Sequence, residues 1–70
     1  MTKTERSALR KAVEKAGGVT QLGELCGVTR QTIHNWLNDG IPEMSQVLKV
    51  ESVTGIPRQE LKPDWFNTAA

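Results

Sequence analysis

The sequence predicts an all-α fold, a compact bundle of four to five short helices that contains a helix-turn-helix. Apolar residues recur at three- and four-residue steps over most of the chain, as in helices that bury one face. Glycine and proline divide the chain into short segments, and a single tight turn at Gly27 joins two of them. We expect residues 1–66 to form one helix-turn-helix domain and residues 67–70 to form a short disordered tail.

Composition narrows the class of protein further. The chain has 70 residues, of which 37% are hydrophobic and 24% charged, so we expect one small soluble domain. It has no apolar run long enough to span a membrane, and we expect a cytoplasmic protein without a secretory signal. A single cysteine, Cys26, builds neither a disulfide framework nor a zinc site, so we expect it to be a small buried residue.

Residues 4–16 are predicted to form the first helix, because five apolar residues share one face. Thr4 and Ser7 are its candidate caps, and the Gly17–Gly18 pair ends it. The five apolar residues are Ala8, Leu9, Ala12, Val13 and Ala16.

Two short helices are predicted next, over residues 19–26 and 30–38. In the first, one face carries Val19, Leu22, Leu25 and Cys26. Thr29 is a good N-cap for the second, whose inward stripe is Ile33, Trp36 and Leu37. Asn38, Asp39 and Gly40 form a strong stop signal.

The C-terminal half is less regular. Residues 44–53 favour a helix whose apolar positions are Met44, Val47, Leu48, Val50 and Val53, although β-branched residues keep a strand open. Residues 58–62 add one further turn, which Pro63 is expected to end. Trp65 and Phe66 then either fold back on the core or mark a dimer contact.

The pattern over residues 19–38 is typical of a helix-turn-helix. Two steeply crossing helices need a small residue where they meet and a turn residue that tolerates positive φ. Gly23 and Gly27 provide these, and Gly23 predicts that another backbone approaches closely. The accompanying apolar set is Leu22, Cys26, Val28, Ile33 and Trp36.

Residues 19–38 resemble the helix-turn-helix of the lambda-repressor/Cro superfamily, in the run VTQLGELCGVTRQTIHNWLN. Gly40–Pro42 and Leu61–Trp65 resemble small Cro-like phage and prophage regulators, and resemble YdaS-like antitoxins even more. The resemblance covers roughly residues 5–66. It departs from the family at Gly23, where alanine is common, and at Val19, where many relatives have a phosphate-binding glutamine.

The resemblance implies a transcriptional repressor that binds double-stranded DNA at a pseudo-palindromic operator and blocks polymerase. Its recognition helix, residues 30–38, would lie in the major groove. The outward side chains of this segment are guanidinium, amide and hydroxyl groups, which are the groups that recognise base edges. The expected base-contacting residues are Arg30, Gln31, Thr32, His34 and Asn35.

Phosphate contacts are expected to flank this set, and the departure at Val19 moves the expectation to its neighbours. Residues 1–35 carry six basic and three acidic side chains, a net +3, whereas residues 36–70 carry three and five, a net −2. The first half therefore suits an anionic partner better. The expected phosphate-contacting residues are Thr20, Gln21, Thr29 and Asn38.

The expected partners are DNA and a second copy of the chain, in a weak homodimer that is completed on DNA, inside a bacterial cell or a phage-infected host. An alternative is an antitoxin that binds a toxin partner and regulates its own promoter. Another is a degenerate motif that makes protein contacts alone. Catalysis is not expected, since Ser7, Ser45 and Ser52 have no base arranged with them. No cofactor or metal is expected, because His34 lacks a second ligand at suitable spacing.

Overall fold

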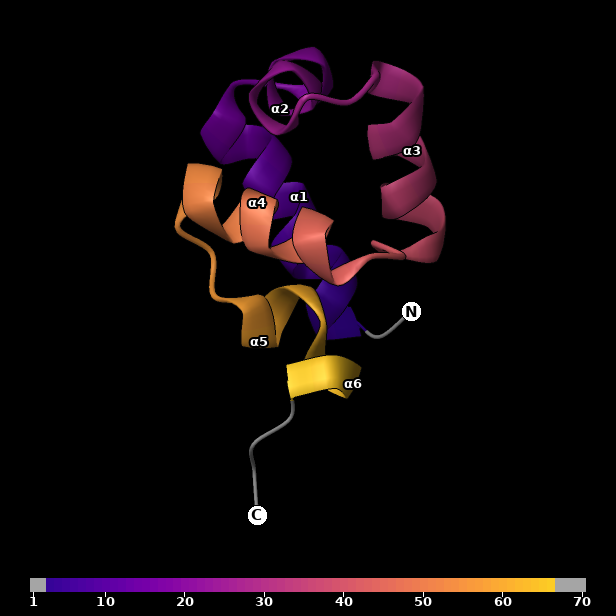
Figure 1. The fold of residues 1–70 in the computed structure, drawn as a ribbon, viewed down its shortest axis with the longest axis vertical. Helices are drawn as coiled ribbons and strands as arrows, with labels where there is room; N and C mark the ends of the chain where they lie inside the picture. The colour runs from indigo at the N-terminus through magenta and orange to yellow at the C-terminus, as the bar shows by residue number, and fades with distance from the viewer. Residues whose placement is uncertain (1–2, 67–70) are drawn as a thin grey trace.

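Six helices and no strand make up residues 3–66, the part of the chain that the computed structural model describes (Figure 1). The all-α prediction is confirmed, with six helices in place of the four to five expected. The predicted tail at residues 67–70 lies outside the described residues. The helices are α1 Lys3–Ala16, α2 Val19–Cys26, α3 Arg30–Asp39, α4 Met44–Thr54, α5 Arg58–Leu61 and α6 Pro63–Phe66.

The longest helix, α1, is the support on which the others assemble. It contacts α2, α3, α4 and α5, and α2 packs against both α3 and α4. In Figure 1, α2 and α3 form one end of the molecule, while α5 and α6 lie at the opposite end below α4. The helix pair that the sequence singles out is therefore braced from one side, and the far side of α3 is left open.

The boundaries of α2 and α3 agree with the predicted ranges to within one residue. The candidate caps of α1 are wrong, because this helix begins at Lys3 and so contains both Thr4 and Ser7. Residues 44–54 form a helix, which settles the alternative in favour of α4. Val47 and Val50, three residues apart on one helical face, are both completely buried, and this burial outweighs their β-branched preference.

The turn predicted over residues 58–62 is α5, which ends before Pro63 as expected, and Pro63 is also the first residue of a further helix, α6. Proline suits this position, where its missing N–H has no helical acceptor to lose. The amides of Trp65 and Phe66 then donate to the Lys62 carbonyl at 3.0 and 3.1 Å. The chain thus adds a short sixth helix that the sequence did not predict.

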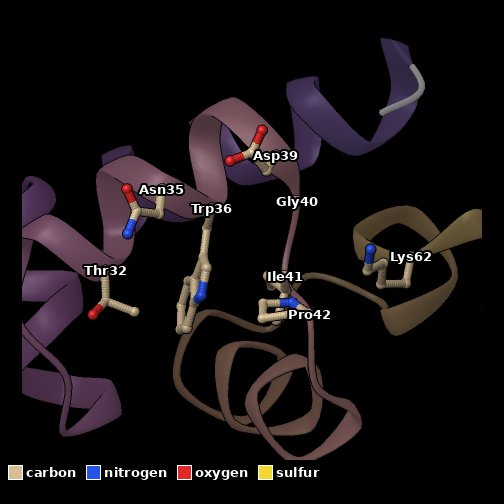
Figure 2. A pocket seen from close by; sticks show the side chains of 8 residues that line it. All are labelled: Thr32, Asn35, Trp36, Asp39, Gly40, Ile41, Pro42 and Lys62. Atoms are coloured by element: carbon tan, nitrogen blue, oxygen red, sulfur yellow. The ribbon is translucent and has the colours of Figure 1, made fainter.

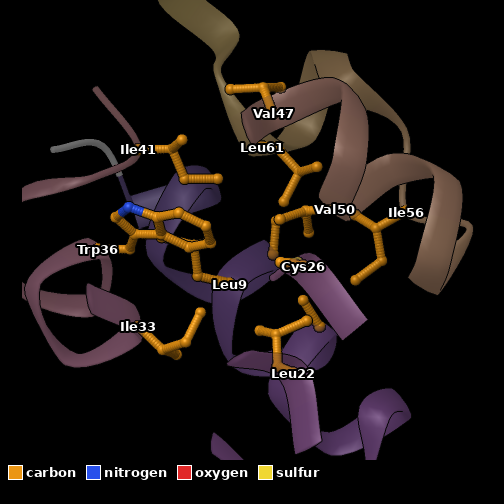
Figure 3. Packing of buried hydrophobic residues seen from close by; sticks show 12 residues of the cluster. Leu9, Leu22, Cys26, Ile33, Trp36, Ile41, Val47, Val50, Ile56 and Leu61 are labelled. Atoms are coloured by element: carbon orange, nitrogen blue, oxygen red, sulfur yellow. The ribbon is translucent and has the colours of Figure 1, made fainter. Parts of the chain in front are cut away.

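The core lies where α1, α2, α3, α4 and α5 converge (Figure 3). Trp36 and Cys26 are buried in it, as predicted. Partly buried hydrophobic residues pack around its edge, among them Val13, Ala16, Val19, Val28, Leu37 and Val53. The core residues are Ala8, Leu9, Ala12, Leu22, Cys26, Ile33, Trp36, Ile41, Val47, Val50, Ile56 and Leu61.

Three residues predicted on inward faces are exposed, namely Leu25, Met44 and Leu48. Each follows the apolar period of its own helix but lies beyond the edge of the surface that the neighbouring helices cover. The two aromatic residues of α6 differ in burial. Phe66 packs against the core, whereas Trp65 is 42% exposed. The ammonium of Lys62 lies 4.6 Å from the centre of the Trp65 ring.

An acidic residue that the sequence analysis treated only as a charge is buried. Glu5 is 1% exposed and lies on the same face of α1 as Ala8, Leu9 and Ala12. Its Oε2 is 3.7 Å from Nζ of Lys62, so an ion pair joins the first helix to the end of α5. A Cβ at Gly40, where φ is +87°, would overlap with the same carboxylate. Glu5 therefore also sets the path of the chain that leaves α3.

Candidate nucleic-acid interface

The turn between α2 and α3 holds these two helices close together. Gly27 has φ 73°, a left-handed conformation that suits glycine, and the amide of Val28 donates to the Gly23 carbonyl at 2.8 Å. A Cβ built on Gly23 would lie 2.9 Å from the carbonyl oxygen of Val28. The close backbone approach predicted at Gly23 is confirmed, and it fixes where α3 begins relative to α2.

The first turn of α3 is capped by Thr29, as predicted. Its Oγ1 accepts a hydrogen bond from the Thr32 amide at 3.3 Å and lies 3.1 Å from the Thr32 hydroxyl. The cap satisfies one of the amides that a helix leaves unpaired at its start. Thr29 is also exposed, so its hydroxyl remains next to the surface.

The outward face of α3 carries most of the residues predicted to contact bases. At about 100° per residue, Gln31 and Asn35 lie near the middle of this face, with Arg30 and His34 towards the edge that borders α1. Thr32 lies towards the opposite edge and is partly buried. The exposed members of the set predicted to contact bases are Arg30, Gln31, His34 and Asn35, and Asn38, which was predicted to contact phosphate, is exposed as well.

Gln31 and Asn35 are hydrogen-bonded to each other across one helical turn. Nε2 of Gln31 donates to Oδ1 of Asn35 at 3.2 Å. The bond leaves Oε1 of Gln31, its second N–H and both N–H groups of Asn35 for an outside partner. This arrangement restricts two flexible side chains and presents an acceptor next to donors, which is the pattern that matches an adenine edge.

The start of α2 holds two residues predicted to contact phosphate. Thr20 and Gln21 are both exposed in its first turn. The N-cap is Gly18, and no side chain caps the helix there. Since the first amides of a helix point outwards and carry partial positive charge, this terminus suits an external anion.

A groove that sequence reasoning missed runs along the other edge of α3 (Figure 2). Its volume is about 310 Å³, and Lys62 lies at its edge, beside the segment of Gly40, Ile41 and Pro42 that leaves α3. The buried indole of Trp36 forms part of its wall. No local signal in the sequence places Lys62 here, because only the tertiary fold brings it close to the residues that follow α3. The residues that line the groove are Thr32, Asn35, Trp36, Asp39, Gly40, Ile41, Pro42 and Lys62.

The single cysteine, Cys26, does not belong to this outward face. Cys26 is buried in the core, and burial raises the pKa of its thiol, an effect that the nearby positive charge of Lys49 partly opposes. The thiol is thus kept protonated at neutral pH and acts as a small apolar side chain. Among the helices of residues 3–66, none is long and apolar enough to cross a membrane.

Comparison with known proteins identifies one family. No curated protein and no solved structure is detectably similar to the chain. A family described as bacterial toxin YdaS matches residues 9–70, which is most of the sequence. The predicted resemblance to YdaS-like proteins is therefore confirmed at the level of the family. The chain belongs to the bacterial toxin YdaS family.

Proposed function

We propose that this protein binds double-stranded DNA in a sequence-dependent way and represses transcription, with α3 as the recognition helix of a helix-turn-helix of the lambda-repressor/Cro type. The observation that carries the proposal is the outward face of α3, where Arg30, Gln31 and Asn35 are all exposed. An α-helix with its side chains is about 10–12 Å across, so α3 fits the major groove, which is about 12 Å wide.

The surrounding geometry supports the same role. Thr20, Gln21 and the open start of α2 supply donors for a phosphate on one side of α3, and Thr29 and Asn38 supply further donors near its two ends. These are binding groups, so we propose a module without catalytic activity. Because one small module covers only about 600–1,000 Å² on DNA, we further propose that two copies bind half-sites about 34 Å apart.

Selection from a random duplex library, followed by affinity measurements, tests the proposal. We expect wild-type protein to enrich one sequence pattern. Arg30→Ala, Gln31→Ala and Asn35→Ala should each reduce the ratio of affinities for the enriched and a scrambled duplex, by about 1–3 kcal/mol where a bidentate contact is lost. Gln59→Ala is the matched control, since Gln59 is an exposed amide on α5. Enrichment of no pattern, or equal losses in the control, would overturn the proposal.

The family match favours a second function, a role within a toxin–antitoxin pair. In that role a partner protein is the main ligand, and DNA binding serves the protein's own promoter. Induced expression in bacterial cells separates the two. If repression is the whole function, the Arg30→Ala/Gln31→Ala double variant should lose every effect of the wild type on growth. Growth arrest that persists in this variant would assign the effect to a protein partner at another surface.

A further inference from the structure

The exposed side of α1 has two basic edges that differ in their surroundings. Arg6 and Arg10, one helical turn apart, border α3 and line a hollow of about 370 Å³ together with Leu37 and Asn38. Figure 1 shows the beginning of α1 beside the end of α3, and the two helices are in contact. Lys11 and Lys15 are exposed on the other edge of the same helix. Only the first edge continues the outward face of α3.

The edge formed by Arg6 and Arg10 is positively charged without a nearby acid in its lining. A second hollow of about 340 Å³ adjoins the first and is lined by Lys3, Arg6, Ser7 and Arg10. Glu5, the acidic neighbour in sequence, is buried on the opposite side of α1 and is paired with Lys62. The residues that line the two hollows thus carry three positive charges, those of Lys3, Arg6 and Arg10, and no negative charge.

Asn38 lies between this basic edge and the outward face of α3. It lies in the last turn of α3, on the same outward side as Gln31, and it also lines the hollow with Arg6 and Arg10. Guanidinium groups bind phosphate through paired N–H donors, and an amide adds a further donor. Arg6 and Arg10 are separated by about 6 Å along the axis of α1, so they present two such forks in a row.

We infer that Arg6, Arg10 and Asn38 form a binding site for the sugar-phosphate backbone of one DNA strand, beside the groove that α3 occupies. The inference rests on the proposed function and adds a second element, α1, to the interface. It assigns to Arg6 and Arg10 a specific contact with phosphates, in contrast to Lys11 and Lys15, which contribute only to net charge.

Two double variants with the same change in charge test this inference. Arg6→Gln/Arg10→Gln removes the proposed site, and Lys11→Gln/Lys15→Gln removes two charges from the other edge. Fluorescence anisotropy with a labelled enriched duplex and a labelled scrambled duplex gives both affinities. The titrations are repeated between about 50 and 200 mM salt. All four substituted residues are exposed, and circular dichroism checks that both variants remain helical.

We expect the arginine variant to lose affinity for both duplexes by the same factor, about tenfold or more. The slope of the logarithm of its affinity against the logarithm of the salt concentration should decrease in magnitude by about two. The lysine variant should keep a slope close to the wild-type value. Equal slopes in the two variants would overturn the inference while leaving the proposed function intact. Failure of wild-type protein to bind either duplex would overturn the proposed function and this site with it.

Discussion

At the residue scale, Gly23 and Cys26 show how closely the helices of the motif are packed. Gly23 faces the backbone of Val28 and Thr29, and Cys26, one turn later on α2, fills the core beneath. Gly23 has no room for a larger side chain without movement of α2 or α3. Both residues therefore help to place α3 relative to α2.

We predict that Gly23→Ala lowers the free energy of unfolding by about 1–3 kcal/mol, because a methyl group 2.9 Å from a backbone oxygen forces the helices apart. Alanine's better helix propensity, worth about 1 kcal/mol, offsets only part of this loss. Urea denaturation measures the change, with Ser52→Ala as the control, because Ser52 is an exposed residue of α4. An unchanged or higher stability would show that α2 and α3 yield easily at this point.

We predict that Cys26 makes the free energy of unfolding decrease as the pH becomes alkaline. Because burial raises the pKa of the folded thiol, the unfolded chain loses its proton first as the pH increases. The stabilisation is fully present below the unfolded pKa of the thiol and is lost as the pH rises through the folded pKa. Urea titrations at increasing pH should show this decline in wild-type protein. Cys26→Ala should remove that part of the slope, and an identical slope in both proteins would contradict the assignment.

At the scale of single helices, α3 depends on its N-cap. Thr29→Ala removes the hydroxyl that accepts from the Thr32 amide, and we predict a loss of about 1 kcal/mol in the free energy of unfolding. Thr20→Ala is the control, since Thr20 is exposed within the first turn of α2 and the N-cap there is Gly18. Thermal denaturation compares the two. A larger loss for Thr20→Ala would place the more important cap on α2.

The helices themselves were predictable because their signals are local. Caps such as Thr29 and breaks such as Gly27 act over a few residues, so α2 and α3 have nearly the predicted bounds. The outward face of α3 follows from the same period. Which side of a short helix is covered depends on distant segments, and this explains the errors at Leu25, Met44 and Leu48. The register of Glu5 with Ala8 and Leu9 was the one signal that indicated its burial.

At the scale of the whole molecule, charged side chains connect the C-terminal elements to the rest. Arg58 lies 3.2 Å from Glu51 of α4 and stacks over the ring of Phe66 in α6 at 5.7 Å. Lys62 pairs with Glu5 of α1 and lies over Trp65. The pair of Lys62 and Glu5 is the better shielded of the two, with side chains 13% and 2% exposed.

We predict that Glu5→Ala lowers the free energy of unfolding by about 3–5 kcal/mol, because it leaves Lys62 without its acid and opens a space beside Gly40. Glu14→Ala is the control, as Glu14 is exposed on the same helix. Chemical denaturation measures both variants. Equal effects would mean that the ion pair contributes no more than a surface charge.

The contact of Glu5 with both Gly40 and Lys62 also orders events during synthesis. Glu5 precedes Lys62 in the sequence, so it is translated first. A nascent chain that already holds α1, α2 and α3 thus still lacks the ammonium group that neutralises the Glu5 carboxylate beneath the end of α3. The ion pair that joins α1 to the end of α5 therefore forms only after the residues of α5 have been translated.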